Sequence, residues 1–237
     1  ALERALEDRR RRKTPVVAAM RYGNPSLGHG LSQLQSLGCS RVLVLPLFPQ
    51  FSRTTVGTTA VAVDTAVRGQ PNPPQTRSIE GYAEDPGYIA ALAASIDQAR
   101  VDDPRSAPLV MSVHGLPTRY VQAGDPYPDQ CRATAEATAA RLGLQPSDWH
   151  LCYQSKIGRE EGLGPATDET LARLGSAGAA GVDVVCPGFA ADCLETVEEI
   201  AVTNRKIYEG AGGCGCRYIA ALNERPDHVE ALADLAA

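Results

Sequence analysis

Seven short apolar runs recur along the chain at fairly even intervals, with helical patterns between them. The runs, rich in β-strand formers, cover residues 15–20, 41–48, 76–82, 109–114, 149–154, 182–189 and 218–222. Helices are expected at residues 86–99, 128–142, 167–174, 192–209 and 226–235. Strands that alternate with helices are typical of a mainly parallel sheet with helices on both faces. The sequence therefore predicts the α/β class.

Two breaks divide this pattern into units. A segment rich in Pro, Gly and Gln at residues 69–75 indicates a surface connection, and a second break falls at residues 102–107. We expect two Rossmann-like, doubly wound domains at residues 1–101 and 102–222, with a last helix at 223–237 that can pack back on the first domain. Residues 2–12 are already helical, whereas such domains usually open with a strand. The first domain is therefore expected to be incomplete at its start, with three strands against four in the second.

Composition excludes several classes of protein. The 237 residues are 43% hydrophobic and 22% charged, an ordinary globular balance, and a net charge of −5 argues against a nucleic-acid surface. The longest apolar runs are far shorter than the ~20 residues of a membrane-spanning helix. Residues 1–13 lack the apolar core of a secretory signal. Seven cysteines in such a chain indicate reduced thiols, so a cytoplasmic protein is expected.

His114 is the first candidate for chemistry. In open parallel sheets, ligands bind beyond the carboxyl ends of the strands, and His114 ends the run at 109–114 before a Gly/Pro turn. An imidazole with a pKa of about 6.5 can accept protons or bind a metal at that place. The alternative is a histidine satisfied by neighbouring backbone. The other three, His29, His150 and His228, are expected to be structural.

An acidic stripe opens the helix expected at residues 192–209. Spacing of i, i+3 and i+7 places Asp192, Glu195 and Glu199 on one face, while Glu198 turns away. A solvated face is the ordinary interpretation of such a stripe. Because it follows an apolar run directly, its first turn should point into the crevice, where clustered acids would have raised pKa values. Such acids could pass protons or hold a cation.

Six ordered segments of the sequence resemble the motifs of ferrochelatases, which insert ferrous iron into protoporphyrin IX to make haem. They are residues 20–26, 44–52 with Thr54 and Thr55, 114–117 followed by 124–128, 153–158, 167–171 and 186–200. They most resemble the proteobacterial branch, including Leu222, Asn223, Pro226 and His228 near the end. The resemblance implies two chelatase-like, Rossmann-like domains with the porphyrin in the cleft between them.

The resemblance also implies roles for individual residues. His114 matches the family's active-site histidine, which takes pyrrole protons or binds the metal, and Glu195 matches its partner carboxylate across the macrocycle. Asp192 and Glu199 match the acidic path for protons or metal. The positions that match porphyrin-binding residues are Arg21, Tyr22, Ser52 and Phe189. Metal insertion requires removal of two pyrrole protons, which a histidine and nearby acids can accept.

Departures from the family pattern carry expectations of their own. Nothing in the sequence matches the N-terminal strand and Leu-Gly-Thr-Pro loop of the family, so part of the porphyrin pocket is expected to lie outside this chain. Some ferrochelatases hold a two-iron, two-sulfur cluster on four cysteines, and Cys214 and Cys216 are the candidate ligands here. Arg53 stands where some cluster-bearing members have a cysteine. The two thiols follow Gly212 and Gly213 so closely that both cannot pack inward.

Three other functions remain open on sequence alone. A sibling chelatase would use cobalt or coproporphyrin, and intrinsic affinity does not separate divalent metals at nitrogen and oxygen ligands. A porphyrin or haem carrier would need the cleft but has no use for His114 together with Glu195. A cluster-binding or redox module would rest on Cys214 and Cys216 alone. The expected partners are protoporphyrin IX and ferrous iron, the iron as substrate, and peripheral contact with a membrane is left open.

Overall fold

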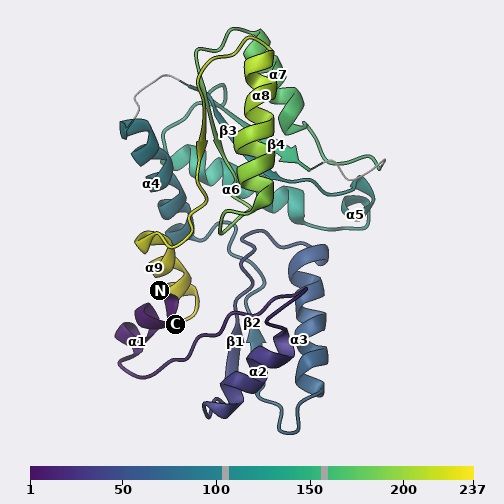
Figure 1. The fold of residues 1–237 in the computed structure, drawn as a ribbon, viewed down its shortest axis with the longest axis vertical. Helices are drawn as coiled ribbons and strands as arrows, with labels where there is room; N and C mark the ends of the chain where they lie inside the picture. The colour runs from purple at the N-terminus through teal and green to yellow at the C-terminus, as the bar shows by residue number, and fades with distance from the viewer. Residues whose placement is uncertain (103–106, 156–159) are drawn as a thin grey trace.

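Two parallel sheets organise the computed structural model, which describes residues 1–102, 107–155 and 160–237 (Figure 1). The first sheet pairs β1 (Arg41–Val44) with β2 (Gln75–Ser78). The second has the order β4-β3-β5-β6 and consists of β3 (Leu109–His114), β4 (Trp149–Gln154), β5 (Val182–Val185) and β6 (Cys216–Ile219). Every ladder between these strands is parallel, which confirms the α/β class.

The first sheet is smaller than the sequence predicts. Residues 15–20 alternate between half-buried and exposed positions, as a strand would, but they form no ladder with β1 or β2. An isolated bridge between Met20 and Ser26 is the pairing found there. The expected strands at 41–48 and 182–189 both stop early, before Pro46 and Pro187, because proline has no N–H to extend a ladder. The prediction of three strands in the first unit is therefore wrong.

Among the described residues, four helices belong to the first unit, and the first of them, α1, lies away from its sheet beside α9. They are α1 (Leu2–Arg10), α2 (Leu27–Ser36), the short π-helix η1 (Arg53–Gly57) and α3 (Thr58–Arg68), which continues η1 directly. Ser26 caps α2, and its hydroxyl accepts a hydrogen bond from the backbone N–H of His29 at 3.2 Å. In Figure 1, α2 and α3 lie together on one side of β1 and β2, and the two helices contact each other.

Helices cover both faces of the second sheet. Their bounds are α4 (Pro86–Asp102), α5 (Thr118–Gln122), α6 (Tyr127–Arg141), α7 (Thr167–Ser176), the π-helix η2 (Glu195–Asn204), α8 (Arg205–Gly210) and α9 (Pro226–Leu235). Successive strand residues point to opposite faces, so Leu109 and Met111 pack toward α4 and α6. Val110 and Val184 pack toward α7, η2 and α8. This is the doubly wound arrangement.

The ends of the chain meet at one side of the molecule. α9 packs against both α4 and α1, and Arg9 in α1 forms ion pairs with Glu230 and Asp234 in α9. Figure 1 shows the two termini next to each other there. The return of the last helix to the first unit stays a prediction, which the contact between α9 and α1 supports. The domain division at residue 101 stays a prediction, but α4 contributes to the core of the second sheet, which argues for an earlier boundary.

A buried ionic group holds the middle of the second sheet. Asp183 in β5 is fully buried, and its two carboxylate oxygens accept hydrogen bonds from Arg100 Nε at 3.0 Å and Arg217 Nε at 2.9 Å. These contacts join α4, β5 and β6.

None of the helices in the described parts of the chain has both the length and the apolar character that a membrane span requires.

Candidate active site

The order of the second sheet fixes where a ligand can bind. The chain leaves β4 on one side of β3 and returns in β5 on the other side. In such sheets the crevice opens beyond the carboxyl ends of the two strands at which the order reverses, here β3 and β5. His114 is the last residue of β3, and Glu195 begins η2 shortly after β5. The fold therefore brings both residues to the place where ligands bind in open parallel sheets.

His114 and Glu195 form a direct pair. Nε2 of His114 lies 3.6 Å from Oε1 of Glu195, and both side chains remain about half exposed, at 43% and 49%. The other ring nitrogen, Nδ1, lies 2.6 Å from the carbonyl oxygen of Gly115. Because a carbonyl only accepts, we assign the proton of the neutral ring to Nδ1. The Nε2 lone pair then faces a carboxylate oxygen, and a proton or a cation can occupy the space between them.

The separation of this pair corrects one expectation. Atoms that touch opposite faces of a flat macrocycle lie roughly 7 Å apart, twice the contact distance of about 3.5 Å. The observed 3.6 Å leaves no room for a porphyrin between His114 and Glu195. The expectation that Glu195 stands across the macrocycle from His114 is therefore wrong for this arrangement, in which the two groups stand side by side.

Asp192 has a different role from the one expected. It precedes η2, and its carboxylate accepts hydrogen bonds from Tyr218 Oη at 2.6 Å, Asn223 Nδ2 at 2.8 Å and Thr196 Oγ1 at 3.1 Å. Burial by itself would raise the pKa of Asp192, but these hydrogen bonds, that from Tyr218 foremost, outweigh it and lower the pKa. The expectation of a raised pKa is wrong for Asp192, which anchors the start of η2 to β6 and to the segment that follows β6.

The remaining acids of η2 follow the predicted stripe. Glu195 faces His114, and Glu199 faces the end of β4, where its Oε1 and Oε2 accept hydrogen bonds from Ser155 N and Oγ, each at 2.7 Å. Glu198 is exposed and accepts a hydrogen bond from Thr203 Oγ1 at 2.8 Å. Glu199 is therefore tied to Ser155 rather than free along a path, and the π-helical form of η2 was not predicted.

Two of the expected porphyrin-binding residues lie together in the first unit. Arg21 donates from Nε to the carbonyl oxygen of Thr58 at 3.1 Å, and its guanidinium carbon lies 4.4 Å from the ring centroid of Tyr22. Tyr22 is 73% exposed, so this cation–π pair is open to a ligand. Phe189, after β5, is half-buried and packs against the core beneath α7 and α8.

Ser52 and Asp125 connect the two units. The Ser52 hydroxyl donates to Asp125 Oδ2 at 2.9 Å, and the same oxygen accepts from Arg53 N at 2.8 Å. Tyr127 N donates to Asp125 Oδ1 at 3.0 Å, while Tyr127 Oη donates to the carbonyl oxygen of His114 at 3.0 Å. Ser52 is only 1% exposed, so direct contact of its hydroxyl with porphyrin does not fit the structure. The role of Asp125 was missed, although it follows Gly124 and precedes a proline in one of the motifs.

We expect the Asp125→Ala protein to unfold more easily by about 1–3 kcal/mol, because three donors, two of them buried, lose their acceptor. Asp129→Ala provides the matched control, since Asp129 is exposed two residues into α6, and it should change the free energy of unfolding by less than about 0.5 kcal/mol. Urea denaturation followed by circular dichroism measures both. An Asp125→Ala protein as stable as the control would contradict the proposed connection.

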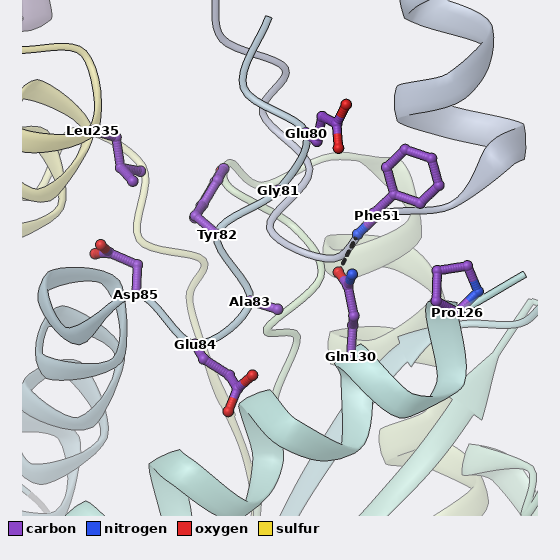
Figure 2. A pocket seen from close by; sticks show the side chains of 10 residues that line it. All are labelled: Phe51, Glu80, Gly81, Tyr82, Ala83, Glu84, Asp85, Pro126, Gln130 and Leu235. Atoms are coloured by element: carbon purple, nitrogen blue, oxygen red, sulfur yellow. Dashed lines mark hydrogen bonds between the residues drawn. The ribbon is translucent and has the colours of Figure 1, made fainter.

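An open pocket of about 620 Å³ lies at a different place between the units (Figure 2). Its lining consists of Phe51, Glu80, Gly81, Tyr82, Ala83, Glu84, Asp85, Pro126, Gln130 and Leu235. Figure 2 shows the hydrogen bond from Phe51 N to Gln130 Oε1, 2.6 Å long, at one side of it. Neither His114 nor Glu195 lines this pocket, so the pocket is separate from the crevice at the ends of β3 and β5.

The two cysteines considered for a cluster are placed differently. Cys214 is exposed, with its Sγ 3.8 Å from the carbonyl oxygen of Ala180, whereas Cys216 is buried in the core beside Tyr208. Within the described ranges, no three His, Cys, Asp or Glu side chains gather as a metal site would require. The pair does not fit a four-cysteine cluster.

Residues 156–158 of the motif at 153–158 lie outside the described residues.

Comparison with solved structures defines the class of fold. SirB from Bacillus subtilis with Fe3+ superposes with a TM-score of 0.70 at 14% identity, covering 98% of this chain and 85% of that one. The sirohydrochlorin chelatase SirB from Bacillus subtilis subspecies spizizenii, in complex with cobalt, gives 0.63 at 13% identity, over 98% and 84%. At such identities the likeness concerns the fold, which is that of the chelatases.

Sequence comparison identifies the family. The family model Ferrochelatase matches residues 1–237. Ferrochelatases of Thioalkalivibrio sulfidiphilus and Nitrosococcus oceani are 49% and 45% identical over 93% and 96% of the chain, which spans 60% and 62% of their lengths. One from Escherichia coli is 44% identical over 94% of the chain and 70% of its own length. The chain belongs to the ferrochelatase family, as the sequence motifs predicted.

Proposed function

We propose that the protein inserts ferrous iron into protoporphyrin IX and releases two protons. The observation that carries this proposal is the pair formed by His114 and Glu195, 3.6 Å apart, beyond the carboxyl ends of β3 and β5. Membership of the ferrochelatase family supports it. The resemblance to proteobacterial members favours protoporphyrin over coproporphyrin, and no observation favours cobalt.

The pair can accept both pyrrole protons from one face of the macrocycle. With Nδ1–H held by the Gly115 carbonyl, the Nε2 lone pair of His114 takes one proton, and the imidazolium so formed is stabilised by Glu195. Glu195 takes the second proton, and because both side chains are about half exposed, His114 and Glu195 then each pass their proton to water. Ferrous iron then replaces the two protons on the pyrrole nitrogens, so charge and atoms balance. Among the three acids, Glu195 is thus the one that takes part in the proton transfer. Asp192 and Glu199 support it through their hydrogen bonds at η2.

Other parts of the chain suit a porphyrin with acidic side chains. The Arg21 guanidinium can bind a propionate, and the exposed Tyr22 ring beside it can cover the macrocycle edge. Phe189 offers an apolar surface near the crevice. We propose a cytoplasmic location, because a chain of this length with seven cysteines is more often a reduced protein than a small disulfide-stabilised one. Peripheral contact with a membrane stays a prediction, and no step is assigned to an iron–sulfur cluster.

The test is metalation under anaerobic conditions, followed by haem absorbance, with porphyrin affinity measured by fluorescence quenching. We expect Glu195→Gln to slow metalation by about 100-fold or more, the scale of lost acid–base catalysis, while porphyrin affinity changes only a few-fold. Glu198→Gln is the matched control on the outward face of η2 and should remain within about threefold of the unmutated rate.

Two results would overturn parts of this proposal. Protein that binds porphyrin tightly but never metalates it would be a carrier. Equal losses in the Glu195→Gln and Glu198→Gln proteins would remove the catalytic role of Glu195 even if the unmutated protein makes haem.

A further inference from the structure

The end of β4 lies directly beside the end of β3, the strand that carries His114. His114 pairs with Gln154 in the register of β3 and β4, and Gly115 N donates to the carbonyl oxygen of Gln154 at 2.8 Å. A Cβ atom at position 115 would lie only 2.8 Å from that same oxygen, so the approach requires glycine there. The backbone of Gln154 therefore limits where the His114–Gly115 turn can lie.

The side chain of Gln154 reaches the opposite partner. It is 3% exposed, and its Nε2 donates to the carbonyl oxygen of Glu195 at 2.8 Å. Its Oε1 accepts a hydrogen bond from Ser112 Oγ at 2.9 Å, which fixes the orientation of the amide. One residue of β4 thus bonds the backbone of Gly115, next to His114, and the backbone of Glu195.

Ser155 holds the next turn of η2. Its backbone and hydroxyl donors occupy both oxygens of Glu199, each at 2.7 Å. Its φ of 62° lies in the left-handed region, which residues other than glycine rarely adopt. Such a conformation persists where surrounding contacts determine it, and strained residues of this kind are concentrated at functional sites.

We propose that Gln154 and Ser155 are positioning residues that set the distance between His114 and Glu195. Gln154 acts through the backbone of Gly115, next to His114, and through the backbone of Glu195. Ser155 acts through Glu199, which lies one turn after Glu195 on the same face of η2. Neither residue needs to touch porphyrin. The catalytic consequence rests on the proposed metal insertion, whereas the geometric consequence does not.

The decisive variant is Ser155→Ala, which keeps the backbone N–H and removes the hydroxyl. We expect the NMR resonances of the His114 ring, assigned by their loss in His114→Ala, to move toward their positions in Glu195→Gln. Metalation should slow by about 10- to 100-fold, the effect of misplacement by an ångström or less, with porphyrin affinity within about twofold. Compared with Ser155→Ala, Ser155→Asn should restore part of the His114 resonance positions and part of the metalation rate. Asparagine tolerates a left-handed backbone conformation and carries a side-chain donor.

Thr203→Ala is the matched control, because it removes another hydroxyl bound to a glutamate, Glu198, on the outward face of the same helix. It should move neither the His114 resonances nor the rate. Ring resonances that stay in place in Ser155→Ala would overturn the inference, and so would an equal change in Thr203→Ala. If the unmutated protein makes no haem, the proposed function fails, and the ring resonances still decide the positioning role.

Discussion

The His114→Ala protein should bind porphyrin within a few-fold of the unmutated affinity but metalate it more slowly by about two orders of magnitude or more. The imidazole supplies the lone pair that faces Glu195, and no other group among the described residues is placed to replace it at the end of β3. Fluorescence quenching gives the affinity, and haem absorbance gives the rate.

His29→Ala is the matched control for this change. His29 lies in α2, on the first unit, and its substitution should leave the metalation rate within about twofold. A His114→Ala protein that makes haem at nearly the unmutated rate would show that the pair is not the proton acceptor, although the family assignment would stand.

The Asp183→Asn protein should lose roughly 3–5 kcal/mol of unfolding free energy, because Arg100 and Arg217, both largely buried, then lose the charge of the carboxylate that they share. Asp183 is fully buried between Arg100 and Arg217, whose side chains are 22% and 13% exposed. Little water can therefore reach the two guanidinium groups in place of the lost carboxylate. Urea denaturation in the cold, where a weakened protein remains folded, gives the free energy of unfolding.

Asp64→Asn provides the comparison, since Asp64 pairs with Arg68 across one turn of α3 with both side chains well exposed. Exposed pairs of this type contribute about 0.3–0.5 kcal/mol. If Asp183→Asn were as mild as Asp64→Asn, the buried group would not hold α4 to the sheet as described.

The sequence predicted all four strands of the second sheet, two of them with their observed bounds. It succeeded most clearly at β3 and β5, which are buried on both faces and appear in the sequence as apolar runs. Trp149–Gln154 and Leu109–His114 were predicted with their observed bounds. Residues 15–20 carry a similar pattern without forming a strand, since a strand also needs a neighbour, and composition does not supply one.

The site residues were predicted only in part, because the sequence shows local patterns but not the contacts between distant positions. His114 was found from its place at a strand end, and Glu195 from helical spacing and motif resemblance. The role of Asp192 depends on Tyr218 and Asn223, and that of Glu199 on Ser155, 44 positions earlier in the chain. Nothing local marks such distant contacts. His228, expected to be structural, is buried with Nδ1 2.9 Å from the carbonyl oxygen of Asn223.

The contact between α1 and α9 has a consequence for the order in which the protein folds during synthesis. Arg9 and Glu230 are separated by 221 positions, so α1 leaves the ribosome long before its partner exists. The apolar face that holds Leu6 and Ala5 stays uncovered until α9 arrives. Contacts of such sequence separation form late, because the loop they close must first lose its freedom. The four-stranded sheet can therefore assemble first, and the docking of α1 on α9 follows it.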